Sequence, residues 1–148
     1  MWLKADNELI TFAGHIYAST DLTGLLIVPK LPMTTTIHHS CVCRSTYGID
    51  IHTGSNYRTN LPQIRTSLDN EENLRLARAF GTPIIIHSEL RDGSLREAVA
   101  EQGIPVLLYE AGEALYFNEP AIRSGLRGVL NVMRAIGMLS ADYKKRPQ

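Results

Sequence analysis

The sequence contains 148 residues, which is the length of one domain and is too short for two domains of ordinary size. Hydrophobic residues make up 44% and charged residues 20%, a composition typical of a folded protein rather than a disordered chain. The 15 basic and 15 acidic residues balance, so bulk charge does not favour binding to nucleic acid or to an anionic membrane.

Targeting and cross-linking signals are also missing from the sequence. No apolar run approaches the roughly 20 residues of a membrane span, and residues 1–6 lack the pattern of a secretory signal. Cys41 and Cys43 are separated by one residue and are poorly placed to bridge each other. We therefore expect a cytoplasmic protein that binds neither membranes nor nucleic acid.

The first 45 residues predict little regular structure. Two segments favour strands, namely residues 8–16 and the apolar run 25–28, which Pro29 ends. Residues 33–46 show no usable periodicity. We therefore expect an organisational boundary near residue 46.

From that boundary on, turn and cap residues follow at regular intervals. The pattern predicts a strand over residues 47–52 and then a polar loop to about Ser67. Asp69, with Glu72 three residues later, resembles a capping box and predicts the start of a helix, and Gly81 is typical of the residue after a helix.

Two further strands and a second helix are expected in the next segment. Residues 84–87 read Ile-Ile-Ile-His without polar alternation, which predicts a strand buried on both faces. Ser94 and Glu97 form a capping box, and the helix that they begin is expected to end at Gly103. Residues 106–109 are apolar and predict a third strand.

The last predicted element is a long helix that begins after Asn118, with Pro120 in its first turn. Five apolar residues recur at the spacing of one buried helix face: Ile122, Leu126, Val129, Leu130 and Met133. Short apolar strands that alternate with helices predict an α/β fold, in which helices cover both faces of a mostly parallel sheet.

Residues suited to catalysis or metal binding lie at the carboxyl end of each predicted strand from residue 47 onward. They are His52, then His87 with Ser88, then Glu110. Ligands of open parallel sheets bind beyond the carboxyl ends of the strands. Imidazole is a common metal ligand, and a partly desolvated glutamate can act as a general base. A histidine that merely ends its strand is an equal alternative for His52, and a rim or core histidine is the better interpretation of His87.

Three charged residues surround His52 in the sequence. Asp50 points to the same strand face and can either orient the imidazole ring or bind loop amides. Arg58 and Arg65 follow in the predicted loop, where a guanidinium can bind a substrate carboxylate, although loop arginines are usually solvated.

A second group of metal-binding residue types lies before residue 46: His38, His39, Cys41 and Cys43. Zinc sites usually pair their ligands as C-x₂₋₄-C, and no second pair follows here. This group is therefore a weak candidate for a metal site.

Four segments, in this order, resemble the succinylglutamate desuccinylase/aspartoacylase family: Gly48–Gly54, Arg58–Arg65, Asp92–Arg96 and Tyr109–Gly112. The resemblance covers roughly residues 46–139. Members of this family are zinc-dependent amidohydrolases with a carboxypeptidase-like catalytic domain. The resemblance implies that residues 46–148 form the C-terminal part of such a domain, preceded by a poorly matching segment over residues 1–45.

Roles follow from the resemblance by position. His52 resembles a zinc ligand, Asp50 a residue that supports this ligand, and Glu110 the general base. Three residues of the following loop resemble part of the substrate pocket: Arg58, Asn60 and Arg65. In the family's mechanism zinc lowers the pKa of a bound water and polarises the acyl carbonyl, while the glutamate moves the proton to the leaving amine.

The early zinc motif of the family, His-x-x-Glu, is not recognisable. Its only candidate begins at His15, and Ala18 stands where the ligand glutamate is expected. Another pair, such as His15 with Asp21 or His39, would have to complete a zinc site. One ligand alone is insufficient for tight zinc binding, so we expect this chain to be a weak or inactive hydrolase.

The sequence is compatible with three functions. The first is a zinc-dependent hydrolase that removes an N-acyl group from an amino acid or a similar small amide. The second is a zinc carboxypeptidase on the same scaffold. The third is a noncatalytic remnant or interaction domain, which would expose apolar surface and could form a homo-oligomer.

Overall fold

The structure is a computed structural model that describes residues 9–12, 15–20, 23–29, 45–54, 58–89, 95–114 and 117–140. The strands are β1 (Leu9–Phe12), β2 (His15–Thr20), β3 (Thr23–Pro29), β4 (Tyr47–Gly54), β5 (Asn60–Thr66), β6 (Ile84–His87) and β7 (Val106–Glu113). The helices are α2 (Glu71–Phe80), α3 (Leu95–Ala100) and α4 (Glu119–Ala135).

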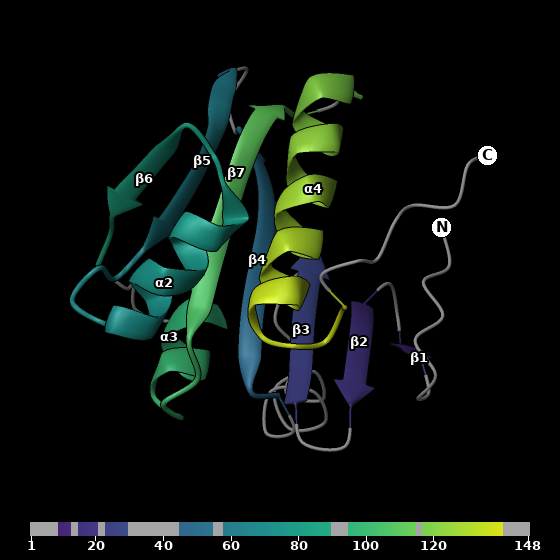
Figure 1. Cartoon of the computed structure of the whole chain (residues 1–148). Coiled ribbons are helices and arrows are strands. Elements are labelled where there is room, and N and C mark those ends of the chain that lie inside the picture. Colours follow the sequence, from purple (N-terminus) through teal and green to yellow (C-terminus); the bar gives the residue numbers. More distant parts are fainter. Residues whose placement is uncertain are drawn as a thin grey trace.

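The described strands form one 7-stranded sheet in the order β1-β2-β3-β4-β7-β5-β6 (Figure 1). Strands β3 and β4, β4 and β7, and β5 and β6 pair in parallel. The other three neighbouring pairs are antiparallel, including β5 with β7. The predicted α/β class is confirmed. The described sheet is mixed because β2, β5 and β6 run in the opposite direction to β1, β3, β4 and β7.

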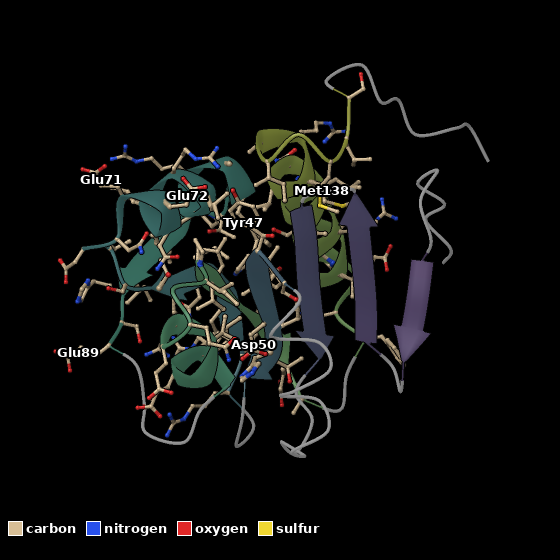
Figure 2. The ribbon with its side chains drawn as sticks, turned by 90° about the horizontal axis from the view of Figure 1, so that it is seen from below. Tyr47, Asp50, Glu71, Glu72, Glu89 and Met138 are labelled. Atoms are coloured by element: carbon tan, nitrogen blue, oxygen red, sulfur yellow. The ribbon has the colours of Figure 1, made fainter. Side chains whose placement is uncertain are left out.

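Helices lie on both faces of this sheet, as predicted. Ile49 and Leu107 belong to the apolar cluster that the sheet forms with α2 and α4. Gly48 points the other way, because a Cβ atom at this position would lie 3.7 Å from Val99 of α3. Alternate residues of a strand point to opposite faces, so Asp50 shares the α3 face with Gly48. Figure 2 shows Asp50 on the side of the sheet opposite Tyr47.

Helix α4 approaches the core through glycines. A Cβ atom at Gly125 would lie only 2.8 Å from the Tyr109 ring, and one at Gly128 would overlap the Phe80 ring. The buried residues of α4 are Ala121, Gly125, Gly128, Val129, Val132 and Met133. The predicted apolar face of α4 is therefore only partly right. The helix packs through its small residues, whose space the aromatic rings fill, and Ile122 of the predicted face is 48% exposed.

The helices begin or end at the predicted cap residues, except that α2 begins one residue later than predicted. The predicted ends at Gly81 and Asn118 are confirmed, since Gly81 has a left-handed backbone and the Asn118 side chain accepts a backbone N–H bond. The N-cap of α2 is Asn70 and not Asp69, because the Asn70 side chain accepts the bond from the backbone N–H three residues later. The predicted capping box at Ser94 lies outside the described residues.

Two predictions about strands after β4 are wrong. The segment expected to be a polar loop contains β5, which is stabilised by ladder bonds to β7 on one side and β6 on the other. The strand expected to be buried on both faces, β6, lies at the end of the described sheet, and Ile84 is 36% exposed. A run of apolar residues does not distinguish a central strand from an edge strand.

Before residue 46, the predicted strand over residues 25–28 is confirmed as part of β3. The strand expected over residues 8–16 is instead the antiparallel pair β1 and β2. Across the described part of the chain, every helix is too short or too polar to cross a membrane.

Candidate functional site

The candidate site lies where β4 and β7 run side by side. His52 and Glu110 are direct partners across this parallel pair. Neighbouring strands lie roughly 4.8 Å apart, and residues that are directly paired project to the same face. The structure therefore brings together the predicted metal ligand and the predicted general base, on the face of the sheet that carries α3.

Asp50 supports the imidazole ring of His52. The Asp50 Oδ1 atom lies 2.9 Å from His52 Nε2, and the Asp50 side chain is only 9% exposed. A carboxylate in this place orients the ring and engages one of its two nitrogens, which leaves Nδ1 as the nitrogen that Asp50 does not contact.

The carboxylate of Glu110 is held by three side chains from β5. Asn60 Nδ2 donates to Oε1 at 3.0 Å, while Gln63 Nε2 and Arg65 Nη1 each donate to Oε2 at 3.4 Å. The Glu110 side chain is 16% exposed. A buried carboxylate is costly unless it is paired, and these donors supply the pairing.

The residues expected to bind substrate divide into two groups. Asn60 and Arg65 contact Glu110, whereas Arg58 is exposed just before β5. Gln63 was not predicted, and neither was the bond from Thr59 Oγ1 to Glu113 Oε2 at 3.1 Å. Gln63 and Arg65 are two residues apart, and in a strand this spacing places two side chains on the same face. The spacing was not informative while the segment was interpreted as a loop.

The other candidates do not join this group. His87 lies on β6, beyond β5, and its Nδ1 accepts the backbone N–H of Leu68 at 3.2 Å. This contact agrees with the interpretation of His87 as a rim histidine. The candidate metal group before residue 46, from His38 to Cys43, lies outside the described residues.

A complete metal centre is not found in the described part of the chain, because its side chains include no group of three or more histidines, cysteines or carboxylates suited to one ion. A catalytic zinc ion needs three protein ligands. His15 and Ala18 lie on β2, which β3 separates from β4. The described residues alone therefore do not fit a zinc ion, although His52 is suited to be one ligand.

Comparisons with known proteins identify the family. The family model of the succinylglutamate desuccinylase/aspartoacylase catalytic domain matches residues 34–136, which is more than half of the chain. A comparison with curated proteins found no match.

Several solved structures share the fold. A succinylglutamate desuccinylase/aspartoacylase from Rhodobacter sphaeroides has 24% identity and a TM-score of 0.62, over 68% of this chain and 31% of that protein. The product-bound ectoine utilization protein EutE (DoeB) from Ruegeria pomeroyi has 17% identity and a TM-score of 0.65, over 75% and 36%. An aspartoacylase family protein from Mesorhizobium loti has 19% identity and a TM-score of 0.57, over 76% and 37%.

At these identities the structural likeness shows the fold alone, and the chain spans about a third of the length of these relatives. The family model, in contrast, covers β4 to α4 and both partners of the candidate site. This chain belongs to the succinylglutamate desuccinylase/aspartoacylase catalytic-domain family of hydrolases.

Proposed function

We propose that this chain hydrolyses the amide bond of a small N-acylated amino acid or a similar small amide. The observation that supports this best is the pairing of His52 with Glu110 across β4 and β7. Such a pair places a proton-transferring carboxylate next to an imidazole on one face of the sheet. Family membership supports a deacylase rather than another class of hydrolase.

Glu110 is proposed to take a proton from the attacking water and to deliver it to the leaving amine. An ionised carboxylate has about four lone-pair sites, and the three bonds from β5 leave room for one more donor. The fourth donor would be the water. A carboxylate fixed in this way meets its water in one orientation, which is what efficient proton transfer requires.

We also propose that His52 is a zinc ligand through Nδ1, with Asp50 holding the opposite side of the ring. A bound zinc ion would lower the pKa of a coordinated water and polarise the acyl carbonyl. The described residues do not provide the other ligands. We expect the isolated chain to turn substrate over slowly.

The test is an assay of the purified 148-residue chain with added zinc, using N-succinyl and N-acetyl amino acids and, in parallel, unmodified peptides. Glu110→Gln should lower any turnover by about 10²-fold or more. Glu113→Gln, on the same strand, is the matched control and should retain it. Turnover that survives Glu110→Gln would contradict the proposed role, and preference for peptides would favour a carboxypeptidase.

A noncatalytic interaction domain is the second candidate, and the incomplete ligand set among the described residues favours it. Metal analysis separates the two functions. Stoichiometric zinc that is lost in His52→Ala would favour the hydrolase, whereas a zinc-free protein without turnover would favour the interaction domain. Strong zinc-dependent turnover abolished by His52→Ala would contradict our expectation that this chain is a weak enzyme.

A further inference from the structure

Three polar side chains of β5 converge on a single carboxylate. Asn60 bonds to one oxygen of Glu110, and Gln63 and Arg65 bond to the other. Both oxygens are therefore held, and by side chains of one strand. We refer to Asn60, Gln63 and Arg65 as the β5 clamp.

An irregularity in the strand makes the β5 clamp possible. Gln63 is paired directly with Glu110 in the antiparallel ladder, and Arg65 shares its face because it is two residues further on. Asn60 is three residues from Gln63, and in a regular strand it would point to the opposite face. The register shifts between these two residues, since Asn60 pairs with Gly112. A bulge of this kind redirects a side chain, here toward Glu110.

The guanidinium of Arg65 is poorly placed to bind a substrate carboxylate. Bidentate binding needs two parallel N–H donors on one edge of the group. Nη1 already donates to Glu110, and Nε is buried without a hydrogen-bond partner among the described residues. Burial of Nε closes the edge that it forms with Nη2. The other edge uses the second N–H of Nη1, so a bidentate contact there would compete with the bond to Glu110.

We infer that Asn60, Gln63 and Arg65 are positioning residues, which fix the orientation of Glu110 for proton transfer instead of binding the substrate. This inference depends on the proposed role of Glu110. It assigns a role to Gln63, and it leaves exposed Arg58 as the candidate for contact with a substrate anion.

The kinetic test compares Arg65→Met and Asn60→Ala with the unmodified chain. Misplacing a catalytic group by about 1 Å costs roughly 10²-fold, so kcat should fall by about that factor while KM stays within about twofold. Arg78→Met, an exposed position on α2, is the control and should change neither constant. A rise in KM with kcat retained would overturn the inference, because loss of substrate binding has that signature.

A second measurement does not require activity. The side-chain amide resonances of Asn60 and Gln63, followed by ¹⁵N NMR, should shift in Glu110→Gln and stay in place in Glu119→Gln. Unchanged resonances in Glu110→Gln would overturn the β5 clamp. If the unmodified chain shows no turnover, only the proposed function fails, because these shifts still decide whether the three side chains hold Glu110.

Discussion

Asp50 and His52 lie two residues apart on β4, and their side chains meet on one face of the sheet, with Asp50 Oδ1 2.9 Å from His52 Nε2. If His52 binds zinc, Asp50 determines which nitrogen faces the ion. Removing such a supporting group typically lowers metal affinity by about 10–100-fold, and this is our expectation for Asp50→Asn. Competition with a chromogenic zinc chelator measures the affinity.

The matched control for this experiment is Asp69→Asn, which changes an exposed aspartate in the segment before α2. It should leave zinc affinity unchanged. Equal affinities of Asp50→Asn and the unmodified chain would show that the contact does not support a ligand. A chain that binds no zinc at all would contradict the proposal for His52 itself.

The contact of α4 with α2 gives a prediction about stability. A methyl group at Gly128 would collide with the ring of Phe80, which is buried. Overpacking of this kind costs about 1–3 kcal/mol, which should exceed the roughly 1 kcal/mol that alanine gains over glycine within a helix. We therefore expect Gly128→Ala to lower the free energy of unfolding, as measured by chemical denaturation.

The control for that prediction is a double variant. Phe80→Leu opens space beneath Gly128, so the combined loss in Gly128→Ala with Phe80→Leu should be smaller than the sum of the two single losses. A Gly128→Ala protein that is more stable than the unmodified chain would show that α4 moves away from α2 at little cost.

The phenol of Tyr109 predicts a loss of stability at alkaline pH. Burial raises its pKa above the ordinary value of 10.0, and its hydroxyl donates to the carbonyl of Ala121 at 2.7 Å. The folded chain therefore keeps this proton when the unfolded chain loses it. The stabilisation is complete below about pH 10 and declines as pH rises toward the pKa of the folded state.

Tyr109→Phe removes this titrating group. In urea denaturation series between about pH 9 and pH 11.5, the unmodified chain should lose stability faster than Tyr109→Phe, and the two curves should converge. At neutral pH the variant should be less stable by about 1 kcal/mol, because one buried hydrogen bond is lost. Parallel curves over the alkaline range would contradict the assignment.

Edge strand β6 predicts self-association. Ile84 is 36% exposed on the last strand of the described sheet, whereas Ile85 packs against the core. Lysine on an edge strand disfavours pairing with another chain. Ile84→Lys should therefore reduce concentration-dependent light scattering, and Ile85→Lys should instead lower the melting temperature. Equal scattering before and after Ile84→Lys would exclude β6 as the associating edge.

Sequence patterns were sufficient to select His52 and Glu110 as candidate site residues. His52 and Glu110 could be selected because each lies late in a strand whose preceding residues are mostly apolar. Their mutual placement depends on β4 and β7 being neighbours, although more than 50 residues separate them. The alternation of strands and helices predicted a sheet, but the pairing of β4 with β7 is known only from the structure.

The β5 clamp could not be predicted in this way. Residues 60–66 contain asparagine and proline, which are uncommon in strands and typical of turns, and they lack the polar alternation of a half-buried strand. The segment is a strand because β7 and β6 both offer it backbone partners. Local propensity is overruled here by hydrogen bonds to residues that are distant in the sequence.

What the sequence determined by itself is therefore local: the end of α2, the start of α4, the course of β4 and the start of β7, and the choice of His52 and Glu110 as candidate residues. These features depend on cap residues and on apolar periodicity, which act within a few positions of the chain. Only the tertiary structure decided that β5 lies between β7 and β6, that Ile122 is exposed, and that Asn60, Gln63 and Arg65 hold Glu110. Each of these depends on which strand or helix lies alongside, and the pairing of distant segments leaves no periodic signal in the segments themselves.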